Sequence, residues 1–374
     1  MKKLFGLFGV FLCIELCTGA LGRPEDFTGD TSDMGEDSVR SCGYNMECVP
    51  AELCENGSIV RDGRTIINAR SGFSSATNYN NGCKWTEACC LNTEKKSRPT
   101  INYVSRGCGY SNPKGVEVTL QNTDNGESQF GEFPWMVSVW EKDTVQGGGT
   151  LLAPNVVLTI AHKIINSSAE NLMVRAGEWD TLITAEPYAH EDRGVATKIV
   201  HPDFDGVVLL NDAALLILKT PFKLAPHIDT ICLPGILDNF NQRRCIVTGW
   251  GKKNLDDPDY PHLLKKIDVP IVDRTKCQRQ LRRTRLGRYF ELHSSFVCAG
   301  GELNKDACFG DGGSPLVCPS LDDPDRYTLA GIVAWGLDCG YENVPGVYVN
   351  VQMLRPWIEA QLQNYHVSSC SYNP

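Results

Sequence analysis

One glycine-rich stretch and two separate polar motifs hold the residue types that acyl-transfer chemistry uses. The stretch reads Asp306-Ala307-Cys308-Phe309-Gly310-Asp311-Gly312-Gly313-Ser314-Pro315, and Ser314 is its only hydroxyl residue. Upstream stand His162, within Thr159-Ile160-Ala161-His162, and Asp212, within Asn211-Asp212-Ala213-Ala214-Leu215. A histidine oriented by a carboxylate can take the proton of a hydroxyl group as that hydroxyl attacks a carbonyl. The sequence therefore raises the question of which hydroxyl would react.

These three motifs resemble those of chymotrypsin-like serine proteases. The family pattern Gly-Asp-Ser-Gly-Gly-Pro matches the glycine-rich stretch, except that Gly312 stands where the family has its serine. Thr-Ala-Ala-His and Asp-Ile-Ala-Leu are the family patterns around His162 and Asp212, and the order along the chain is that of the family. The resemblance implies that the base and its orienting carboxylate are present and that the nucleophile is absent.

The chemical consequence of glycine at this position is severe. Glycine has no side-chain oxygen, and removing such a nucleophile costs on the order of 10⁶ in turnover. Ser314 lies two residues further on, so a loop with the family geometry would direct it away from His162. The sequence therefore predicts a serine protease homologue without peptidase activity. An active peptidase that uses Ser314 is the alternative, and it requires the loop to rebuild.

A second departure concerns the activation segment. The family is activated by a cut after a basic residue that precedes Ile-Val-Gly-Gly, upstream of a stretch like Gly131-Glu132-Phe133-Pro134-Trp135. This chain has Asn122-Thr123-Asp124-Asn125 at the corresponding positions, with no Lys or Arg just before them. In the family the freed amino terminus pairs with the aspartate before the serine, which corresponds to Asp311. Without that cation, we expect the oxyanion pocket of the Gly310 and Gly312 amides to stay unformed.

The resemblance also implies the remnant of a substrate pocket. Asp306 matches the acidic floor that binds Arg or Lys in the family, and it lies six residues before Gly312. Ala334-Trp335-Gly336 matches the Ser-Trp-Gly wall, with its serine lost. A basic side chain could then be bound without being cut, although a relic explains Asp306 equally well. A hydrogen bond between His162 and Asp212 could likewise serve only to stabilise the loop.

Four carboxylates lie in the segment that binds calcium in some relatives of this family: Glu178, Asp180, Glu186 and Glu191. Carboxylate oxygens are suitable calcium ligands, so Glu178 and Glu186 form a candidate metal site. Carboxylates in a loop are also common as solvated charge, and we favour that interpretation. No cofactor is expected to be required, and calcium is an optional ligand.

Composition and the N-terminus indicate a secreted protein. The chain has 374 residues, a formal net charge of −9 and a sequence pI near 5.4, which argues against a nucleic-acid partner. Lys2 and Lys3 precede an apolar run and the small residues Thr18-Gly19-Ala20, so residues 1–22 are predicted to be a signal peptide. The 17 cysteines fit an oxidising compartment. No other stretch is long enough to span a membrane, so we expect a soluble, extracellular chain.

A cysteine-rich segment precedes the protease-like region. Residues 23–41 are a predicted acidic arm. Six cysteines follow within residues 42–90, and because few apolar residues lie between them, this segment is not expected to fold without cross-links. The closing Cys-Cys pair and Glu47-Cys48-Val49-Pro50 resemble the clip domain of arthropod proteases, with a generic disulfide knot as the alternative. The resemblance implies the pairs Cys42–Cys89, Cys48–Cys83 and Cys54–Cys90. Residues 91–107 are a predicted linker whose basic residues are cleavage candidates or serve only solubility.

The protease resemblance covers residues 108–374 and implies four more disulfides, Cys108–Cys232, Cys245–Cys318, Cys277–Cys298 and Cys308–Cys339. One family bridge is absent as a pair, because Gly147-Gly148-Gly149 and His162-Lys163 stand at its two ends. Loss of Cys13 and Cys17 with the signal peptide leaves Cys370 over. Cys370 is therefore predicted to be unpaired or bonded to another chain.

Surface modification and a basic segment complete the sequence-based predictions. Asn56 and Asn166 each begin an Asn-X-Ser pattern and are predicted glycosylation acceptors. The arginine-rich run 276–288 is interpreted as an interaction or cleavage loop, or as a solvated face.

Short β-branched or aromatic runs, separated by Gly, Pro, Asn and Asp, predict an all-β fold of two antiparallel barrels. The predicted strands include residues 136–140, 156–159, 214–218, 245–248, 329–335 and 346–351. Residues 354–362 are a predicted packing helix, because apolar residues recur there at helical spacing. Together with the resemblance, this gives a chymotrypsin-like double β-barrel preceded by a small disulfide-knotted clip domain.

Function follows from the resemblance rather than from residue chemistry. Clip-bearing homologues of this kind act as non-catalytic cofactors in arthropod melanisation, which implies that this chain assists prophenoloxidase activation in innate immunity after a clip-domain protease cuts it. The resemblance therefore implies extracellular partners in a haemolymph-like fluid, namely prophenoloxidase and clip-domain proteases, with oligomers forming after cleavage. Two alternatives are a matrix or cell-adhesion protein and a binder of microbial surface polysaccharide. Retention in matrix without cleavage would favour the first alternative, and direct polysaccharide binding the second.

Overall fold

The computed structural model describes residues 103–120, 126–182, 186–252 and 259–373, with positions 41–43, 46–50, 54–55, 58–59, 83 and 87–92 of the cysteine-rich segment. The predicted signal peptide, Asn56, residues 122–125 and most of the predicted arm and linker lie outside the described residues. The domain bounds given above therefore stay predictions. Among the described residues, no helix is long and apolar enough to cross a lipid bilayer.

The cysteine-rich segment contains a small five-stranded sheet. Its strands are β1 (Ser41–Gly43), β2 (Met46–Pro50), β3 (Cys54–Glu55), β4 (Ser58–Ile59) and β5 (Glu87–Leu91), in the spatial order β1-β2-β5-β4-β3. Disulfides join Cys42 to Cys89, Cys48 to Cys83 and Cys54 to Cys90. Because strands this short bury little apolar surface, the cross-links supply much of what holds the sheet together.

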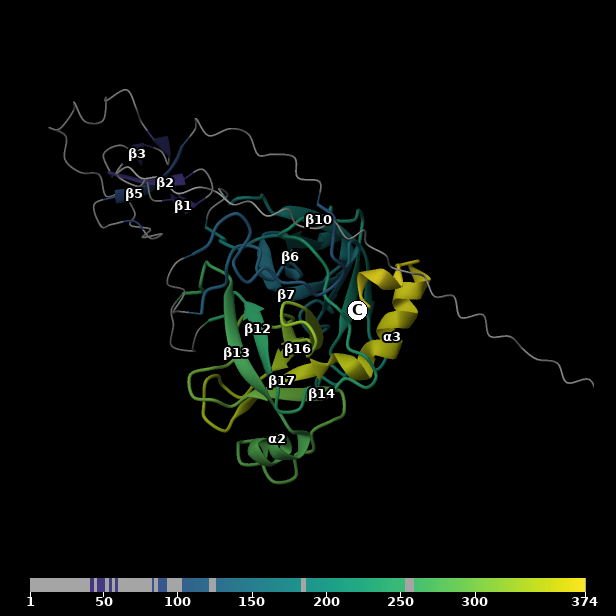
Figure 1. The fold of residues 1–374 in the computed structure, drawn as a ribbon. Helices are drawn as coiled ribbons and strands as arrows, with labels where there is room; N and C mark the ends of the chain where they lie inside the picture. The colour runs from purple at the N-terminus through teal and green to yellow at the C-terminus, as the bar shows by residue number, and fades with distance from the viewer. Residues whose placement is uncertain are drawn as a thin grey trace, which may run out of the picture. The chain divides into compact units, whose positions relative to one another are not determined.

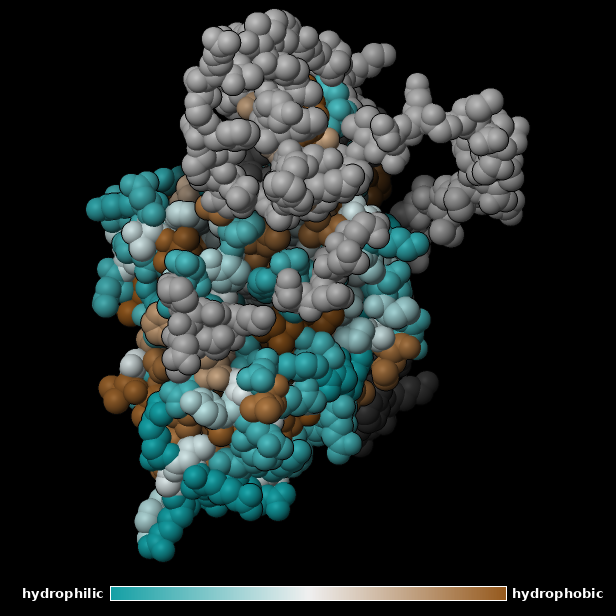
Figure 2. Space-filling view, turned by 90° about the vertical axis from the view of Figure 1, so that its left-hand side faces the viewer, coloured by the Kyte–Doolittle hydropathy of each residue, from teal (hydrophilic) through white to brown (hydrophobic). Residues whose placement is uncertain are grey.

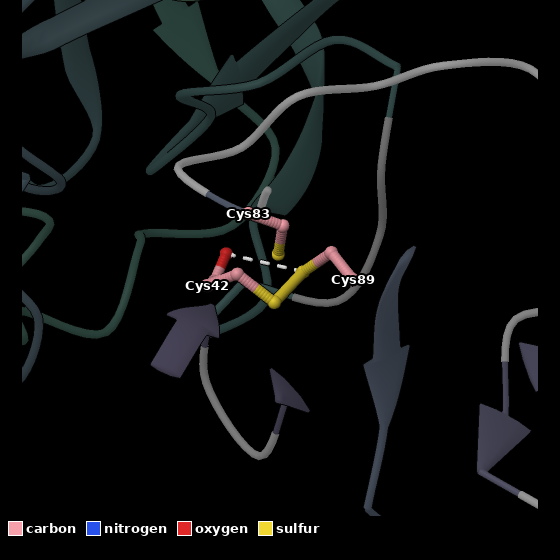
Figure 3. A group of neighbouring side chains, drawn as sticks. All are labelled: Cys42, Cys83 and Cys89. Atoms are coloured by element: carbon pink, nitrogen blue, oxygen red, sulfur yellow. Dashed lines mark hydrogen bonds between the residues drawn. A yellow bond between two sulfur atoms is a disulfide. The ribbon is translucent and has the colours of Figure 1, made fainter. Parts of the chain in front are cut away.

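Three sulfur atoms of this sheet, those of Cys42, Cys83 and Cys89, lie within 4.8 Å of one another, a spacing that a metal ion could bridge (Figure 3). Cys42 and Cys89 are bonded to each other, however, and Cys83 is bonded to Cys48. None of the three therefore offers the thiolate that a metal ion requires. This cluster is a disulfide crossing and not a metal site.

Two closed six-stranded barrels follow (Figure 1). The first contains β6 (Met136–Glu141), β7 (Thr144–Ala153), β8 (Val156–Thr159), β9 (Leu172–Ala176), β10 (Glu191–Val200) and β11 (Ala214–Leu218). The second contains β12 (Arg244–Gly249), β13 (Lys265–Val272), β14 (Phe296–Gly300), β15 (Pro315–Pro319), β16 (Tyr327–Trp335) and β17 (Pro345–Asn350). The described residues also contain the short 3-10 helices η2 (Ala169–Asn171) and η3 (Ser369–Ser371). The predicted chymotrypsin-like double barrel is confirmed.

Apolar side chains from both barrels form one continuous core at their junction. Trp135 and Leu158 of the first barrel region and Ile332 and Val347 of the second belong to the same buried cluster. Separate clusters fill the two barrel interiors. Dense packing of this kind fixes the barrels against each other, so loops from both are held at the junction.

Four disulfides cross-link the barrel region, namely Cys108–Cys232, Cys245–Cys318, Cys277–Cys298 and Cys308–Cys339. Cys370 is also disulfide-bonded. The prediction that Cys370 is unpaired is therefore wrong for this chain.

Helix α3 (Val351–Asn364) ends the barrel region and packs beside the barrels (Figure 1). The strand predicted to end at residue 351 ends at Asn350, because the Asn350 side chain accepts a hydrogen bond of 3.3 Å from the Met353 amide and so caps the helix. The helix buries one stripe, made by Val351, Leu354, Ile358 and Leu362. The predicted packing helix 354–362 thus exists and is longer at both ends.

A second helix, α2 (Arg274–Leu281), lies in the arginine-rich run and was not predicted from the sequence. Asp273 starts it by accepting hydrogen bonds from the amides of Thr275 and Lys276. That aspartate was the available signal for a helix start.

On the face that Figure 2 shows, hydrophobic side chains of the described residues form separate patches among hydrophilic ones.

Candidate functional site

His162 and Asp212 meet because the strands that carry them are neighbours. His162 follows β8 and Asp212 precedes β11, and these strands pair with Thr159 opposite Ala214. The Asp212 carboxylate lies 2.6 Å from His162 Nδ1 and accepts a 2.8 Å hydrogen bond from the His162 amide. Asp212 is fully buried, whereas a quarter of the His162 side chain is exposed. The predicted base and its orienting carboxylate are thus brought together.

Gly312 lies against the residues on either side of His162. A Cβ atom added to Gly312 would lie 2.9 Å from Ile160 Cδ1 and 3.7 Å from Lys163 Cε. The first distance is shorter than real Cβ contacts, so the terminal methyl group of the fully buried Ile160 would have to shift to admit a Cβ. Ile160 stands where the family pattern has alanine, so its side chain fills the space that a residue larger than glycine would need.

Ser314 is buried and does not reach the surface of the cleft. It is 1% exposed, and its Oγ would lie 2.3 Å from a Cβ on Gly148 and 3.0 Å from a Cβ on Gly249. Gly148 belongs to β7 and Gly249 to β12, so the hydroxyl is enclosed between the two barrels. A substrate carbonyl has no access to this oxygen, which argues against the alternative of a Ser314 peptidase.

Asp311 is fully buried and is held by backbone amides. Its two carboxylate oxygens accept hydrogen bonds of 2.8 Å from Gly251 and 3.0 Å from Cys308. Burial raises the pKa of Asp311 to about 6. No cation contacts this carboxylate in the described part of the chain.

A cleft of about 370 Å³ opens beside this loop. Its lining includes His162, Lys163, Gly310, Gly312, Ala334 and Gly336. Sequence reasoning missed Lys163, whose ammonium lies 5.8 Å from the centre of the exposed Phe309 ring at the mouth of the cleft. The only signal for it was its place directly after His162.

Asp306 lies behind the inner wall of the cleft and does not line it. A Cβ added to Gly346, which does line it, would come within 2.9 Å of Asp306 Oδ1 and 3.4 Å of the Tyr348 hydroxyl. Within the described residues neither of these two buried oxygens has a hydrogen-bond partner, whereas the other carboxylate oxygen of Asp306 accepts a 3.4 Å hydrogen bond from the Gly340 amide. Burial raises the pKa of Asp306 to about 7, and the neighbouring Asp311 carboxylate also raises it. The predicted pocket floor is thus a buried acid that no cation of the described residues contacts.

The predicted calcium ligands lie in one cluster, and two basic side chains share it. Glu178, Glu186 and His190 offer ligand atoms within 4.8 Å of one another. The Glu178 carboxylate lies 3.3 Å from Arg175 Nη1 and 3.0 Å from His190 Nδ1. Burial raises the pKa of Glu186 to about 8. Calcium prefers oxygen ligands, so this arrangement does not fit calcium unless Arg175 and His190 release Glu178.

Asn166 is exposed in the turn that follows His162, as a glycosylation acceptor must be. Its modification stays a prediction.

Because of Asp306, the free energy of unfolding is expected to fall as the pH rises. Its pKa of about 7 lies above its ordinary value of 3.8, so the folded state holds this proton more tightly than the unfolded state, and stability falls between about pH 4 and pH 7. Asp306→Asn should therefore change the free energy of unfolding more favourably at about pH 8 than at about pH 5. The difference between its effects at the two pH values should be about 2–3 kcal/mol. Urea denaturation at the two pH values measures this.

The exposed Asp322 provides the control for this measurement, because Asp322→Asn should show no such pH dependence. Asp311 and Tyr348 also face Asp306, and both are present in every variant. A gain from Asp306→Asn that is equal at the two pH values would contradict the assignment.

Comparison with known proteins agrees with this architecture. A family model described as Trypsin matches residues 123–358, and one described as Serine protease Clip domain PPAF-2 matches residues 35–91. Phenoloxidase-activating factor 2 of Galleria mellonella is 45% identical over 289 residues, which cover 73% of this chain and 95% of that protein. The inactive CLIP domain-containing serine protease A8 of Anopheles gambiae is 39% identical over 345 residues, which cover 88% and 92%.

A third relative is matched over only part of its length. Protein masquerade of Drosophila melanogaster is 37% identical over 240 residues, which cover 63% of this chain and 22% of that protein. The double barrel, the paired His162 and Asp212 and these matches lead to one conclusion. The chain belongs to the trypsin family of serine proteases and their homologues, in the group that carries an N-terminal clip domain.

Proposed function

We propose that the chain is a secreted, non-catalytic protease homologue in which Gly312 occupies the position of the nucleophile. The observation that carries the proposal is that Gly312, which lies beside the residues flanking His162, has no side-chain oxygen, and that Ile160 Cδ1 packs 2.9 Å from where a Cβ would stand. The burial of Ser314 removes the nearest substitute hydroxyl. Relatives from Anopheles gambiae that are named inactive, one 39% and one 35% identical, support the same reading. The disulfides of both regions fit secretion.

The non-catalytic chain acts as a binding cofactor in an extracellular protease cascade and assists the activation of prophenoloxidase. The name of the Galleria mellonella relative supports this step, and the cleft beside His162 supplies a ready binding surface. Prophenoloxidase and clip-domain proteases are the proposed partners. Cleavage of the chain by such a protease precedes its assembly into oligomers.

Reconstitution tests this function. Prophenoloxidase and its activating clip-domain protease are mixed with and without the full chain, and phenoloxidase activity is measured. We expect activity to rise several-fold with the chain, and to rise equally when the chain has been treated with a fluorophosphonate, since no hydroxyl of the chain takes part. A rise that the reagent abolishes would show a catalytic role instead.

Absence of any rise would reject the cofactor role. Retention of the uncut chain in extracellular matrix, or sedimentation of the chain with microbial polysaccharide, would then identify which alternative holds.

A further inference from the structure

The arginine-rich part of the chain, residues 274–288, forms a surface of one charge that the proposed function does not use. This basic surface contains six arginines and one lysine, and no Asp or Glu lies among them. Every one of these cationic residues except Arg282 is exposed. The chain as a whole has a net charge of −9, so the basic surface reverses the charge of the molecule locally. It begins with α2, which lies beyond β14 at the end of the second barrel (Figure 1).

The basic surface is firmly attached to the barrel and is not an open loop. The Cys277–Cys298 disulfide joins α2 to β14. After the helix, Arg282 Nε donates a 2.7 Å hydrogen bond to the Phe290 carbonyl oxygen, and Leu286 and Phe290 pack against the main core. A protease cuts extended, accessible chain, so this attachment argues against a cleavage loop. A surface that is already ordered loses little conformational entropy when a ligand binds.

The charges of the basic surface are not balanced within the described part of the chain. Lys276 and Arg283 form no ion pair with a described carboxylate. Arg285 lies 3.5 Å from Asp338, but both side chains are exposed, so this pair contributes little. Lys276 also lies in the first turn of α2, where the helix dipole disfavours a cation, and Arg279 follows it one turn later. This arrangement weakens the helix, so the stability of the fold does not explain it.

The side chains of the basic surface suit oxyanions that are attached to sugar rings. Arginine predominates there, and a guanidinium group binds a planar or tetrahedral oxyanion through two parallel hydrogen bonds. Tyr289 is 81% exposed, and the Arg288 guanidinium lies 4.7 Å from the centre of its ring and donates a 2.6 Å hydrogen bond to its hydroxyl. The exposed face of such a ring can pack against the apolar face of a sugar.

A matching ligand must carry several anionic groups along its length, because cations spread over a helix and the following turns cannot all reach one carboxylate. A linear sulfated polysaccharide has this form, and its sugar rings make it stiffer than an acidic peptide. Less ordering entropy is therefore lost when it binds than when a flexible acidic segment of a protein binds. Such polysaccharides occur outside cells, which agrees with the disulfides of the chain.

We infer that residues 274–288 bind a linear sulfated polysaccharide, with Lys276, Arg283 and Arg288 in contact with its sulfate groups. The basic surface would hold the chain at sulfated material outside cells. His162 and Gly312 are not part of it, so the cleft beside them stays open to a protein partner. This inference does not depend on the proposed cofactor role.

Surface plasmon resonance with heparin, a linear sulfated polysaccharide, tests the inference. The full natural chain is passed over immobilised heparin, over heparin freed of its sulfate groups, and over polyglutamate, at about 0.15 M salt. We expect binding to heparin to be at least about tenfold tighter than to either of the others. It should also weaken as salt is added, because ion pairs with a polyanion release its counterions. Equal binding to polyglutamate would overturn the inference and indicate an acidic protein partner.

A triple variant assigns the binding to the basic surface. Lys276→Gln, Arg283→Gln and Arg288→Gln together should weaken heparin binding at least about tenfold and reduce its dependence on salt, because fewer counterions are released. These side chains are exposed, so the variant should unfold in urea at the same concentration as the natural chain. Unchanged heparin binding by the folded triple variant would refute the assignment.

A second triple variant controls for net charge. It removes three exposed lysines that lie outside the basic surface, by Lys114→Gln, Lys219→Gln and Lys223→Gln. Heparin binding should change by less than about twofold, since the same total charge is removed from other places. An equal loss of binding in the two triple variants would show that net charge alone attracts heparin, and it would overturn the inference. Reconstitution with prophenoloxidase contains no polysaccharide, so each result can fail without the other.

Discussion

Replacing Gly312 with serine is expected not to restore a reactive nucleophile, whereas the same change combined with Ile160→Ala is expected to restore one. Serine alone would place its Cβ 2.9 Å from Ile160 Cδ1. Ile160→Ala removes that obstacle and leaves His162 and Asp212 in contact. The recovered hydroxyl would then lie within reach of the His162 base, at a hydrogen-bond distance of about 2.6–3.2 Å.

Labelling by a fluorophosphonate measures this prediction directly, because the reagent reports an activated hydroxyl. The natural chain and Gly312→Ser should stay unlabelled, and the double variant should be labelled at residue 312. Full turnover is not expected, because Asp311 has no cation to organise the oxyanion pocket. Because the natural chain has no serine at this position, its turnover is expected to be lower than that of an active protease by a factor on the order of 10⁶.

Two controls make the comparison interpretable. Ile160→Ala alone leaves a cavity and should cost about 2–4 kcal/mol of stability, so the folding of each variant is verified by denaturation. Labelling of Gly312→Ser as strong as that of the double variant would show that Ile160 is not the obstacle. Labelling of the natural chain at Ser314 would reject the non-catalytic assignment altogether.

Sequence patterns predicted the barrels well because local composition specifies short strands. The runs 156–159 and 214–218 are β-branched or aliphatic, are bounded by turn-forming residues, and coincide with β8 and β11. Pairing of these two strands brings His162 to Asp212, so a resemblance in two motifs was enough to predict that contact. The arginine-rich run obscured α2, because its charge suggested a loop more strongly than Asp273 suggested a cap.

Contacts between barrels could not be read from the sequence. Ile160 and Gly312 belong to different barrels, and their mutual fit depends on how closely the junction packs. In the sequence, Ile160 is only one substitution within a histidine motif. The same holds for Lys163, whose position over the cleft is visible only once the loop that carries Phe309 is in place. Asp306 was found by its motif, but the burial that leaves its Oδ1 atom without a hydrogen-bond partner among the described residues is determined only by the fold.

The missing family disulfide leads to the second large effect. Gly147 stands at one of its two ends, and a Cβ added there would lie 2.3 Å from the carbonyl oxygen of Gly312. That oxygen also accepts a 2.9 Å hydrogen bond from the Gly148 amide. The Gly312 carbonyl oxygen belongs to the backbone, and the position of a Cβ on residue 147 is fixed by the backbone. Neither atom can therefore move aside as the end of a long side chain could. The loop of Gly312 is therefore held against β7 by direct backbone contact.

Gly147→Ala is accordingly expected to cost about 3 kcal/mol or more in the free energy of unfolding, measured by urea denaturation. Gly206→Ala is the matched control, because a Cβ there meets only ordinary contacts at 3.6 Å, and it should cost much less. For the same steric reason, Gly147→Cys with Lys163→Cys should destabilise the chain rather than rebuild the bridge. Formation of that disulfide without loss of stability would show that the loop moves freely away from β7. Destabilisation would instead mean that the missing disulfide and the close contact between the Gly312 loop and β7 depend on each other. Restoring the two cysteines alone would then not restore the bridge.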